Sequence, residues 1–232
     1  MKNAFECKGK PVPRLAGRDF TDEEILAAVA PKSERPLLRV NIEIGDNECP
    51  LRCRYCYSNS GEPTPQTTLG YDEIISIIDE AVDLGARSIV LTGGGEPLLE
   101  RHNYKGIIEH VTRRDAIPVI FTCAYTITPD IAKWLYDHNA TIIAKLNSTE
   151  ANPGPTNELS GRNDAHEKML GAIESLIGAG FPGDDPHRLR LGVESVITLS
   201  NYCEIVPLWC WIRDRGLFPY IELTKLMGRA RY

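Results

Sequence analysis

The stretch Leu38–Tyr57 reads LRVNIEIGDNECPLRCRYCY, and the interpretation of the chain begins here. Its first part, Leu38–Ile44, is rich in apolar and β-branched residues and predicts a β-strand. A loop with the cysteine spacing C-x3-C-x2-C follows directly. In α/β proteins the active site forms at the carboxyl ends of parallel strands, so this loop is expected to lie at a functional edge.

Downstream of the loop, further strand-like runs alternate with segments of 3.6-residue apolar periodicity. The predicted strands cover residues 38–44, 87–92, 117–122, 140–146, 189–197 and 218–223, and the predicted helices cover 71–84, 104–113, 128–138, 165–179 and 202–214. Six strands with a crossover between neighbours predict a parallel sheet. A closed eight-unit barrel needs about 250 residues. We therefore predict an α/β fold, a partial (β/α)6 TIM-like barrel with outer helices, with a doubly wound open sheet as the alternative.

We expect a domain boundary between residues 37 and 38. Residues 1–37 contain several prolines and few apolar residues, which predicts an N-terminal extension with one short helix at 22–29, and residues 38–232 form the core domain. The stretch 152–162, rich in Gly, Pro and Asn, is predicted to be a loop. The sequence stops shortly after the sixth strand, without a helix to cover that edge, so we expect a C-terminal portion to be missing.

Composition limits the classes of function. Hydrophobic residues make up 42% and charged residues 25% of the 232-residue chain, as in an ordinary globular protein. A net charge of −6 argues against nucleic acid as a partner. No apolar run approaches the roughly 18 residues of a membrane span, and the first ten residues lack a secretory signal, so a cytoplasmic protein is predicted. Seven cysteines, an odd number, then indicate metal or redox chemistry.

The three clustered cysteines, Cys49, Cys53 and Cys56, offer three thiolates on one short loop. Iron–sulfur clusters usually take four cysteine ligands, so three leave one iron open for an exogenous ligand. The alternative is a zinc site in a zinc-stabilised binding module. Zinc needs a fourth ligand, and none lies at a finger-like spacing.

The pattern C-x3-C-x-aromatic-C after a first strand resembles the signature of the radical S-adenosylmethionine (SAM) superfamily. The resemblance implies a [4Fe–4S] cluster on Cys49, Cys53 and Cys56, with SAM bound to the open iron. It also implies a flavodoxin- or ferredoxin-type electron donor and cleavage of SAM to a 5′-deoxyadenosyl radical that abstracts hydrogen. In this family the aromatic position, here Tyr55, contacts adenine through its backbone; shielding of the cluster is the alternative role.

A glycine-rich turn, TGGGEP at residues 92–97, follows the second strand. Glycines allow a backbone to approach a ligand closely. The turn resembles the Gly-Gly-Glu turn of the same superfamily, which implies that Gly94, Gly95 and Glu96 bind the methionine part of SAM. In isolation the sequence would equally suit a plain tight turn.

Polar residues of later strands are further candidates. Asn147 and Ser148 follow the fourth strand and suit ribose hydroxyls or a carboxylate, although Asn and Ser are also common in turns. Glu194 and its neighbour Ser195 lie within the fifth strand, so one of the two faces inward, where a buried charge needs a partner such as ribose or substrate. Cys123, after the third strand, is a candidate hydrogen donor or substrate contact, with simple core packing as the alternative.

The segment Gly228-Arg229-Ala230 resembles the junction found in members with a C-terminal SPASM or twitch domain, which holds an auxiliary Fe–S cluster. Such relatives act on peptides, sugars or aminocyclitols. We therefore predict a natural-product enzyme that oxidises, epimerises or rearranges a sugar- or aminocyclitol-type small molecule. A peptide-modifying maturase and a glycyl-radical activase are the alternatives; the N-terminal extension and this junction argue against the activase. Glu222, at the end of the sixth strand, is expected to reach the substrate cavity.

Overall fold

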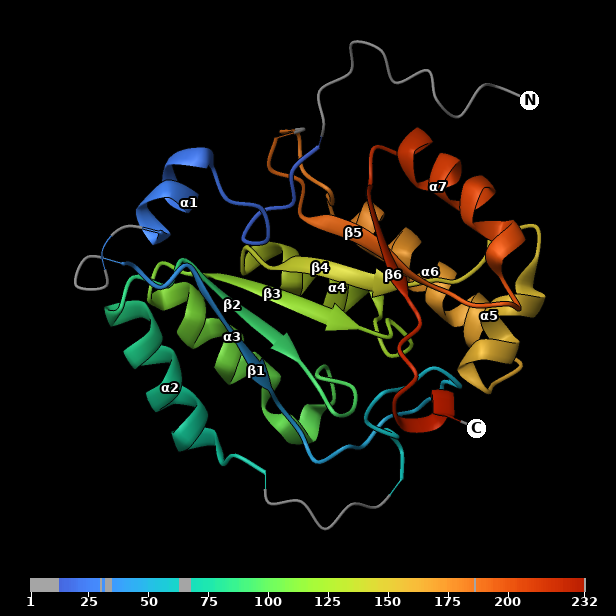
Figure 1. Cartoon of the computed structure of the whole chain (residues 1–232), viewed down its shortest axis with the longest axis horizontal. Helices are drawn as coiled ribbons and strands as arrows, with labels where there is room; N and C mark the ends of the chain where they lie inside the picture. Colours follow the sequence, from blue (N-terminus) through green and yellow to red (C-terminus); the bar gives the residue numbers. More distant parts are fainter. Residues whose placement is uncertain (1–12, 30, 32–34, 63–67, 186, 232) are drawn as a thin grey trace.

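A single parallel sheet organises the chain. The computed structural model describes residues 13–29, 31, 35–62, 68–185 and 187–231. The sheet contains β1 (Arg39–Glu43), β2 (Ser88–Thr92), β3 (Ile117–Thr122), β4 (Thr141–Lys145), β5 (Leu191–Ile197) and β6 (Phe218–Leu223), in that spatial order and all parallel (Figure 1). A doubly wound sheet would reverse its strand order at a switch point. The sequential order therefore confirms the partial barrel over the alternative.

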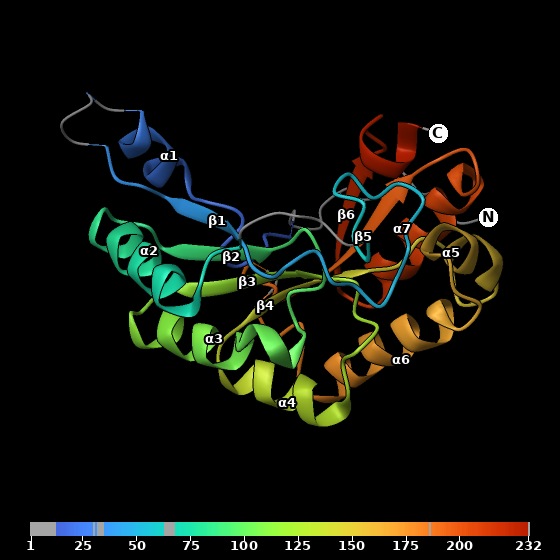
Figure 2. The same cartoon turned by 90° about the horizontal axis from the view of Figure 1, so that it is seen from below.

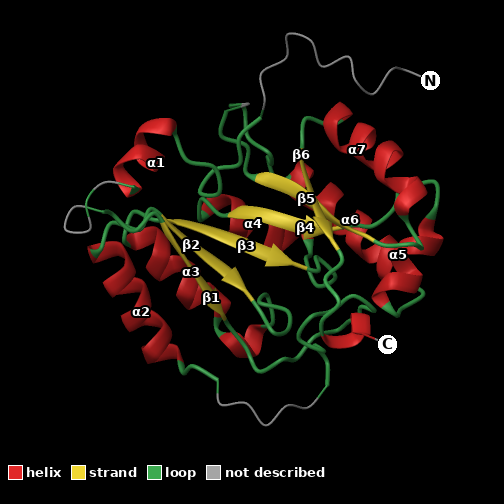
Figure 3. Cartoon of the chain, in the orientation of Figure 1, coloured by secondary structure: helices red, strands yellow, loops and turns green. Residues whose placement is uncertain are grey.

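Helices cover the outer face of the sheet. They are α2 (Tyr71–Asp83), α3 (Tyr104–Arg113), α4 (Pro129–Asp137), α6 (Ala165–Gly178) and α7 (Ile205–Asp214), close to the predicted ranges. Figure 2 shows α2, α3, α4 and α6 along one side of the curved sheet, and Figure 3 shows the helices around the fan of strands. The main apolar core fills the space between them, with Ile78, Ile108 and Leu135 fully buried. The other face of the sheet is left to form the inside of the barrel.

The N-terminal segment fills the amino end of that inside. Leu15 is fully buried against Val90, Val119 and Ile143 on the inner face of the strands. Its neighbour Ala16 donates a backbone hydrogen bond to Leu189 (2.8 Å) just before β5. Leu15 therefore fills the amino end of the inner space among the described residues. The short helix α1 (Asp22–Ala28) follows, as expected, and residues 1–12 of the extension lie outside the described residues.

The predicted loop at 152–162 is wrong. The structure has a helix there, α5 (Pro153–Ser160), which begins with proline and ends at Gly161 with φ +71°. Proline lacks an N–H that the first turn of a helix does not need, and glycine adopts the left-handed conformation that ends a helix. Proline and glycine, which are common in loops, therefore begin and end this helix. Across the described residues, no helix is both long enough and apolar enough to cross a bilayer.

Candidate functional site

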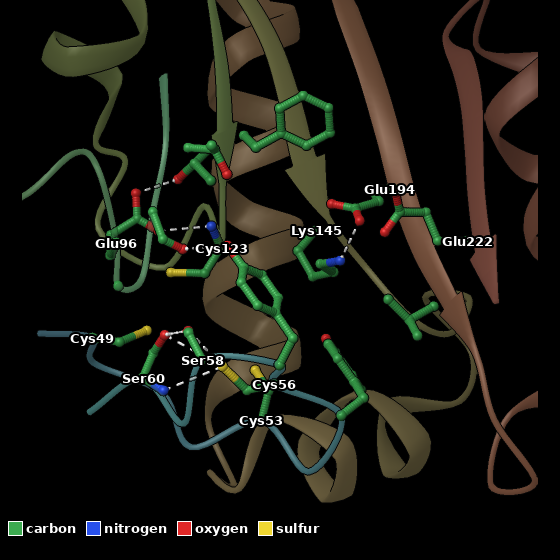
Figure 4. A pocket seen from close by; sticks show the side chains of 18 of the residues that line it. Cys49, Cys53, Cys56, Ser58, Ser60, Glu96, Cys123, Lys145, Glu194 and Glu222 are labelled. Carbon is green, nitrogen blue, oxygen red and sulfur yellow. Dashed lines mark hydrogen bonds and ion pairs between the residues drawn. The ribbon is translucent and has the colours of Figure 1, made fainter. Parts of the chain in front are cut away.

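A cavity of about 670 Å³ opens at the carboxyl ends of the strands. All six strands and the cysteine loop contribute to its wall, and the contributing side chains include Asn41, Thr92, Phe121, Lys145, Glu194 and Tyr220. Residues two apart on a strand share a face, so the inward positions of neighbouring strands meet in this space. Figure 4 shows the cysteines and Glu96 on one side of the cavity and Lys145, Glu194 and Glu222 on the other.

The structure brings Cys49, Cys53 and Cys56 together on the cavity wall. The loop that carries them has no regular secondary structure and is held by its neighbours instead. The backbone N–H of Arg52 donates to the carbonyl of Ser160 at the end of α5 (3.0 Å). On the opposite side, the N–H of Glu96 donates to the carbonyl of Glu48 (2.8 Å). These contacts fix the loop over the end of the sheet.

Cys56 has the most polar surroundings of these thiols. The backbone N–H of Ser60 donates to its Sγ (3.2 Å), and the hydroxyls of Ser58 and Ser60 lie 3.4 and 3.3 Å from the sulfur. Burial raises the pKa of the Cys56 thiol, but these hydrogen bonds outweigh it and bring the pKa below its ordinary value. A thiol whose pKa is lowered is prepared to bind metal as a thiolate.

Cys53 lies in drier surroundings. Burial first, and the neighbouring Cys49 second, raise the pKa of Cys53 to about 11. A bound metal cation would supply the positive charge that such a thiolate needs, because metal binding releases the thiol proton.

The donor set fits a cluster with an open iron. Iron–sulfur clusters usually take four cysteine ligands, so three thiolates leave one iron without a protein ligand. Cys49, Cys53 and Cys56 share one loop and face a cavity large enough for a cofactor. They would hold three corners of a [4Fe–4S] cluster and leave the fourth iron without a protein ligand.

The glycine turn packs directly on the cysteine loop. Gly95 has φ +138°, and a Cβ there would lie 2.5 Å from the carbonyl oxygen of Glu48, so only glycine fits. Gly95 lines the cavity, whereas Gly94 does not and instead lies close to Asn47 and Ser58. The close approach explains Gly95 and fixes the position of the next residue, Glu96.

Glu96 presents a fixed carboxylate at the cavity wall. It is only 1% exposed and accepts hydrogen bonds from Leu98 N (3.0 Å), Thr122 Oγ1 (2.7 Å) and Cys123 N (2.7 Å). A carboxylate has about four lone-pair sites, so capacity for one further donor remains. The arrangement suits an ammonium group of a ligand.

Cys123 also lines the cavity. Its backbone holds Glu96, and its thiol lies beside Cys49. Burial first, and the contact with Cys49 second, raise the pKa of Cys123 well above the ordinary value for a thiol. The structure thus places Cys123 in the cavity wall between the cysteine loop and the glycine turn.

Of the two candidates on β5, Glu194 lines the cavity, and Ser195 is buried without lining it. The sequence analysis expected a ligand to pair with the buried Glu194 carboxylate, but a side chain of the protein does so. Lys145 Nζ lies 2.7 Å from Glu194 Oε1. Burial raises the pKa of Glu194, Lys145 opposes this shift, and Glu222 reinforces it. Lys145, which the sequence analysis did not single out, also lies 5.3 Å from the centroid of the Tyr55 ring.

Asn147 and Ser148 lie behind the cavity wall. Asn147 is fully buried, donates to the Tyr55 hydroxyl (3.0 Å) and accepts from Val196 N (3.1 Å). The hydroxyls of Ser148 and Thr156 lie 2.7 Å apart and join the strand exit to α5. Asn147 therefore positions Tyr55, which does line the cavity, and the structure does not bring these two polar side chains to the cavity surface.

Other lining residues also escaped the sequence analysis. The Tyr57 hydroxyl donates to Glu43 Oε1 (2.8 Å), which joins the cysteine loop to the end of β1. The alternation of β1 was the available signal, because Arg39, Asn41 and Glu43 share one face and all line the cavity.

Comparisons with known proteins agree with this geometry. Residues 46–192 match the family model of the radical SAM superfamily. The GTP 3′,8-cyclase of Ectopseudomonas mendocina (strain ymp) is 27% identical over 184 residues, which cover 78% of this chain and 52% of the relative. The enzyme of the same name from Aeromonas hydrophila subsp. hydrophila is 29% identical, with 76% and 51% covered. The chain thus spans about half the length of these curated relatives.

Solved structures show the same fold. Native anSMEcpe with bound AdoMet and Cp18Cys peptide has a TM-score of 0.61 at 15% identity, covering 82% of this chain and 51% of that chain. Streptococcus suis SuiB bound to S-adenosylmethionine has a TM-score of 0.62 at 17% identity, covering 82% and 39%. At such identities the likeness concerns the fold, whereas the family model matches more than half of the sequence. The chain belongs to the radical SAM superfamily.

Proposed function

We propose that Cys49, Cys53 and Cys56 hold the [4Fe–4S] cluster of this radical SAM enzyme and that Glu96 holds the cofactor beside it. The observation that carries the proposal is the convergence of these three thiols and the Glu96 carboxylate on one cavity. When bound, the cluster and SAM supply a 5′-deoxyadenosyl radical able to abstract hydrogen from an unactivated carbon. The protein's own part is to orient the cofactor and substrate and to exclude water.

Each wall of the cavity has a role in this proposal. Glu96 would accept a hydrogen bond from the amino group of SAM with its remaining lone pair, and Gly95 holds Glu96 in place by packing on the backbone of Glu48. Tyr55, held by Asn147, and the Lys145–Glu194 pair form the opposite wall, which suits the nucleoside end of SAM. Asn147 acts through Tyr55, as a positioning residue.

For the substrate we propose a polar small molecule of the sugar type. The lining residues Asn41, Tyr220 and Glu222 offer hydrogen-bonding groups to hydroxyls, and Glu222 lies on the side of the cavity away from Glu96 (Figure 4). The curated relatives carry the name GTP 3′,8-cyclase, which specifies a ribose-containing substrate. A peptide is the alternative substrate, in line with the peptide bound in anSMEcpe. A flavodoxin- or ferredoxin-type protein in the cytoplasm would provide the electron, and an auxiliary cluster domain remains an expectation.

Anaerobic reconstitution tests the proposal. The wild-type chain should bind about four iron and four sulfide, and dithionite with SAM should yield 5′-deoxyadenosine. Deuterium transfer into 5′-deoxyadenosine from labelled sugars, aminocyclitols or peptides then identifies the substrate class. One zinc per chain without iron would overturn the proposal in favour of a zinc-stabilised module. Formation of a glycyl radical on a stoichiometric partner enzyme would replace the substrate class with that of an activase.

A further inference from the structure

The segment after β6 crosses the mouth of the barrel. We call residues 224–231 the C-terminal strap; it ends in the short helix η4 (Gly228–Arg231). At its start, Thr224 Oγ1 donates to the carbonyl of Ile197 (2.6 Å) at the end of β5. Lys225 and Met227 line the cavity. Figures 1 and 2 both show η4 beside the cysteine loop, although the strap begins at the opposite edge of the sheet.

The strap ends in a dense contact made by Arg229. Its backbone N–H donates to the carbonyl of Cys56 (3.0 Å), and its Nη1 donates to the carbonyl of Cys53 (2.8 Å). Its Nη2 donates to the carbonyl of Ser60, and its Nε pairs with Glu62 (3.0 Å). Two of the three carbonyl acceptors therefore belong to cysteines proposed to hold the cluster.

This contact suits arginine in particular. The cysteine loop lacks regular secondary structure, so its buried carbonyls need donors from elsewhere. A planar guanidinium has five N–H donors in a fixed fork and can serve converging acceptors, whereas a lysine ammonium acts as a point charge. The Arg229 side chain is only 17% exposed, so these charged hydrogen bonds are partly shielded from water.

Gly228 brings the strap close enough for this contact. It has φ +54°, and a Cβ there would overlap the carbonyl oxygens of Cys56 and Tyr57. Both residues of the pair Gly228–Arg229 are therefore matched to the backbone of the cysteine loop. A segment that only passed near the loop would not require either feature.

We propose that Arg229 is a positioning residue for the cluster, which ties the backbone of the cysteine loop so that Cys49, Cys53 and Cys56 face one cubane together. The inference rests on the cluster function proposed above. The guanidinium also places a positive charge beside an anionic site. Net charge and hydrogen bonding set the potential of Fe–S clusters, so this charge favours the reduced state.

The test compares Arg229→Gln, Arg229→Lys and the matched control Arg231→Gln, in which an exposed arginine two residues away is changed. All are reconstituted anaerobically as the full chain. Iron release to a chelator is followed by absorbance, and the cluster potential by dye-mediated titration. Losing a charged hydrogen bond from the loop should speed release at least about tenfold in both Arg229 variants. The potential should fall in Arg229→Gln and stay nearer the wild-type value in Arg229→Lys, which keeps the charge.

The melting temperatures of the cluster-free variants distinguish a role of Arg229 in positioning the cluster from a role in folding. We expect the apo melting temperature of Arg229→Lys to fall by at most a few degrees below that of Arg231→Gln, while its cluster is lost about tenfold faster. Gly228→Ala gives a second, independent way to push the strap off the loop and should also speed iron release. Wild-type release rates in the Arg229 variants, or a loss of apo stability in step with cluster loss, would overturn the inference. A wild-type chain that binds no iron would instead overturn the proposed function.

Discussion

Glu96→Gln isolates the proposed contact between the protein and the amino group of SAM. The substitution keeps the shape of the side chain and removes its charge. A hydrogen bond to a charged group contributes about 1.5–3 kcal/mol, so SAM should bind about 10- to 150-fold more weakly. The effect should fall on the dissociation constant of SAM measured anaerobically by calorimetry on the cluster-loaded protein.

The same substitution also has a cost in the free enzyme. Glu96 accepts from Leu98 N and Thr122 Oγ1 through one oxygen and from Cys123 N through the other. Glutamine must turn its NH2 group toward one of these backbone N–H donors. Leaving a buried donor unpaired costs about 1–3 kcal/mol, so the melting temperature of the apo protein should fall as well. Melting curves therefore accompany every affinity measurement.

Glu48→Gln is the matched control. Glu48 lies on the neighbouring cysteine loop, but its carboxylate pairs with Arg101 at the surface, where the Glu48 side chain is 49% exposed. Removing that charge changes the net charge equally and should leave SAM affinity within about twofold, because exposed ion pairs contribute little. If Glu96→Gln, folded and loaded with iron, bound SAM as tightly as this control, Glu96 would not hold the amino group.

Further predictions concern the cysteines and the buried ion pair. Replacing any one of the three loop cysteines by alanine should abolish 5′-deoxyadenosine formation, measured by chromatography; normal SAM cleavage by one such variant would contradict the cluster assignment. Lys145→Met leaves the buried Glu194 carboxylate without its partner and should lower the free energy of unfolding by about 3–5 kcal/mol, measured by denaturant titration. The double variant with Glu194→Leu should recover part of that free energy. Cys123→Ala should retain iron and SAM cleavage. If the thiol donates hydrogen to the product, the variant should change how much label the product takes up from labelled water, whereas unchanged uptake would leave Cys123 a packing residue.

Much of the fold follows from local patterns. The run Leu38–Ile44 and its counterparts downstream have a period and length that specify strands and helices whatever surrounds them. The alternation of these elements then restricts the topology to parallel arrangements. The loop 152–162 was misread because proline and glycine serve equally well in turns and at the ends of a helix such as α5.

The candidate site likewise has parts that local sequence patterns predict and parts that they do not. The three cysteines and the turn Gly95–Glu96 are each contained within a few residues, so their spacing alone revealed them. The positions of Asn147 and Ser148 behind the wall depend on how α5 and β5 pack around them, which their own neighbours in the sequence do not encode.

What the sequence by itself determined is thus the set of strands and helices, the three cysteines proposed as ligands and the glycine turn, because each is a short-range pattern. Only the tertiary structure decided that Lys145 neutralises Glu194, that Leu15 plugs the amino end of the barrel and that Arg229 holds a cysteine loop 176 residues before it. These contacts join segments that meet only when the sheet curves. Their partners are fixed by three-dimensional proximity, which no local spacing reports.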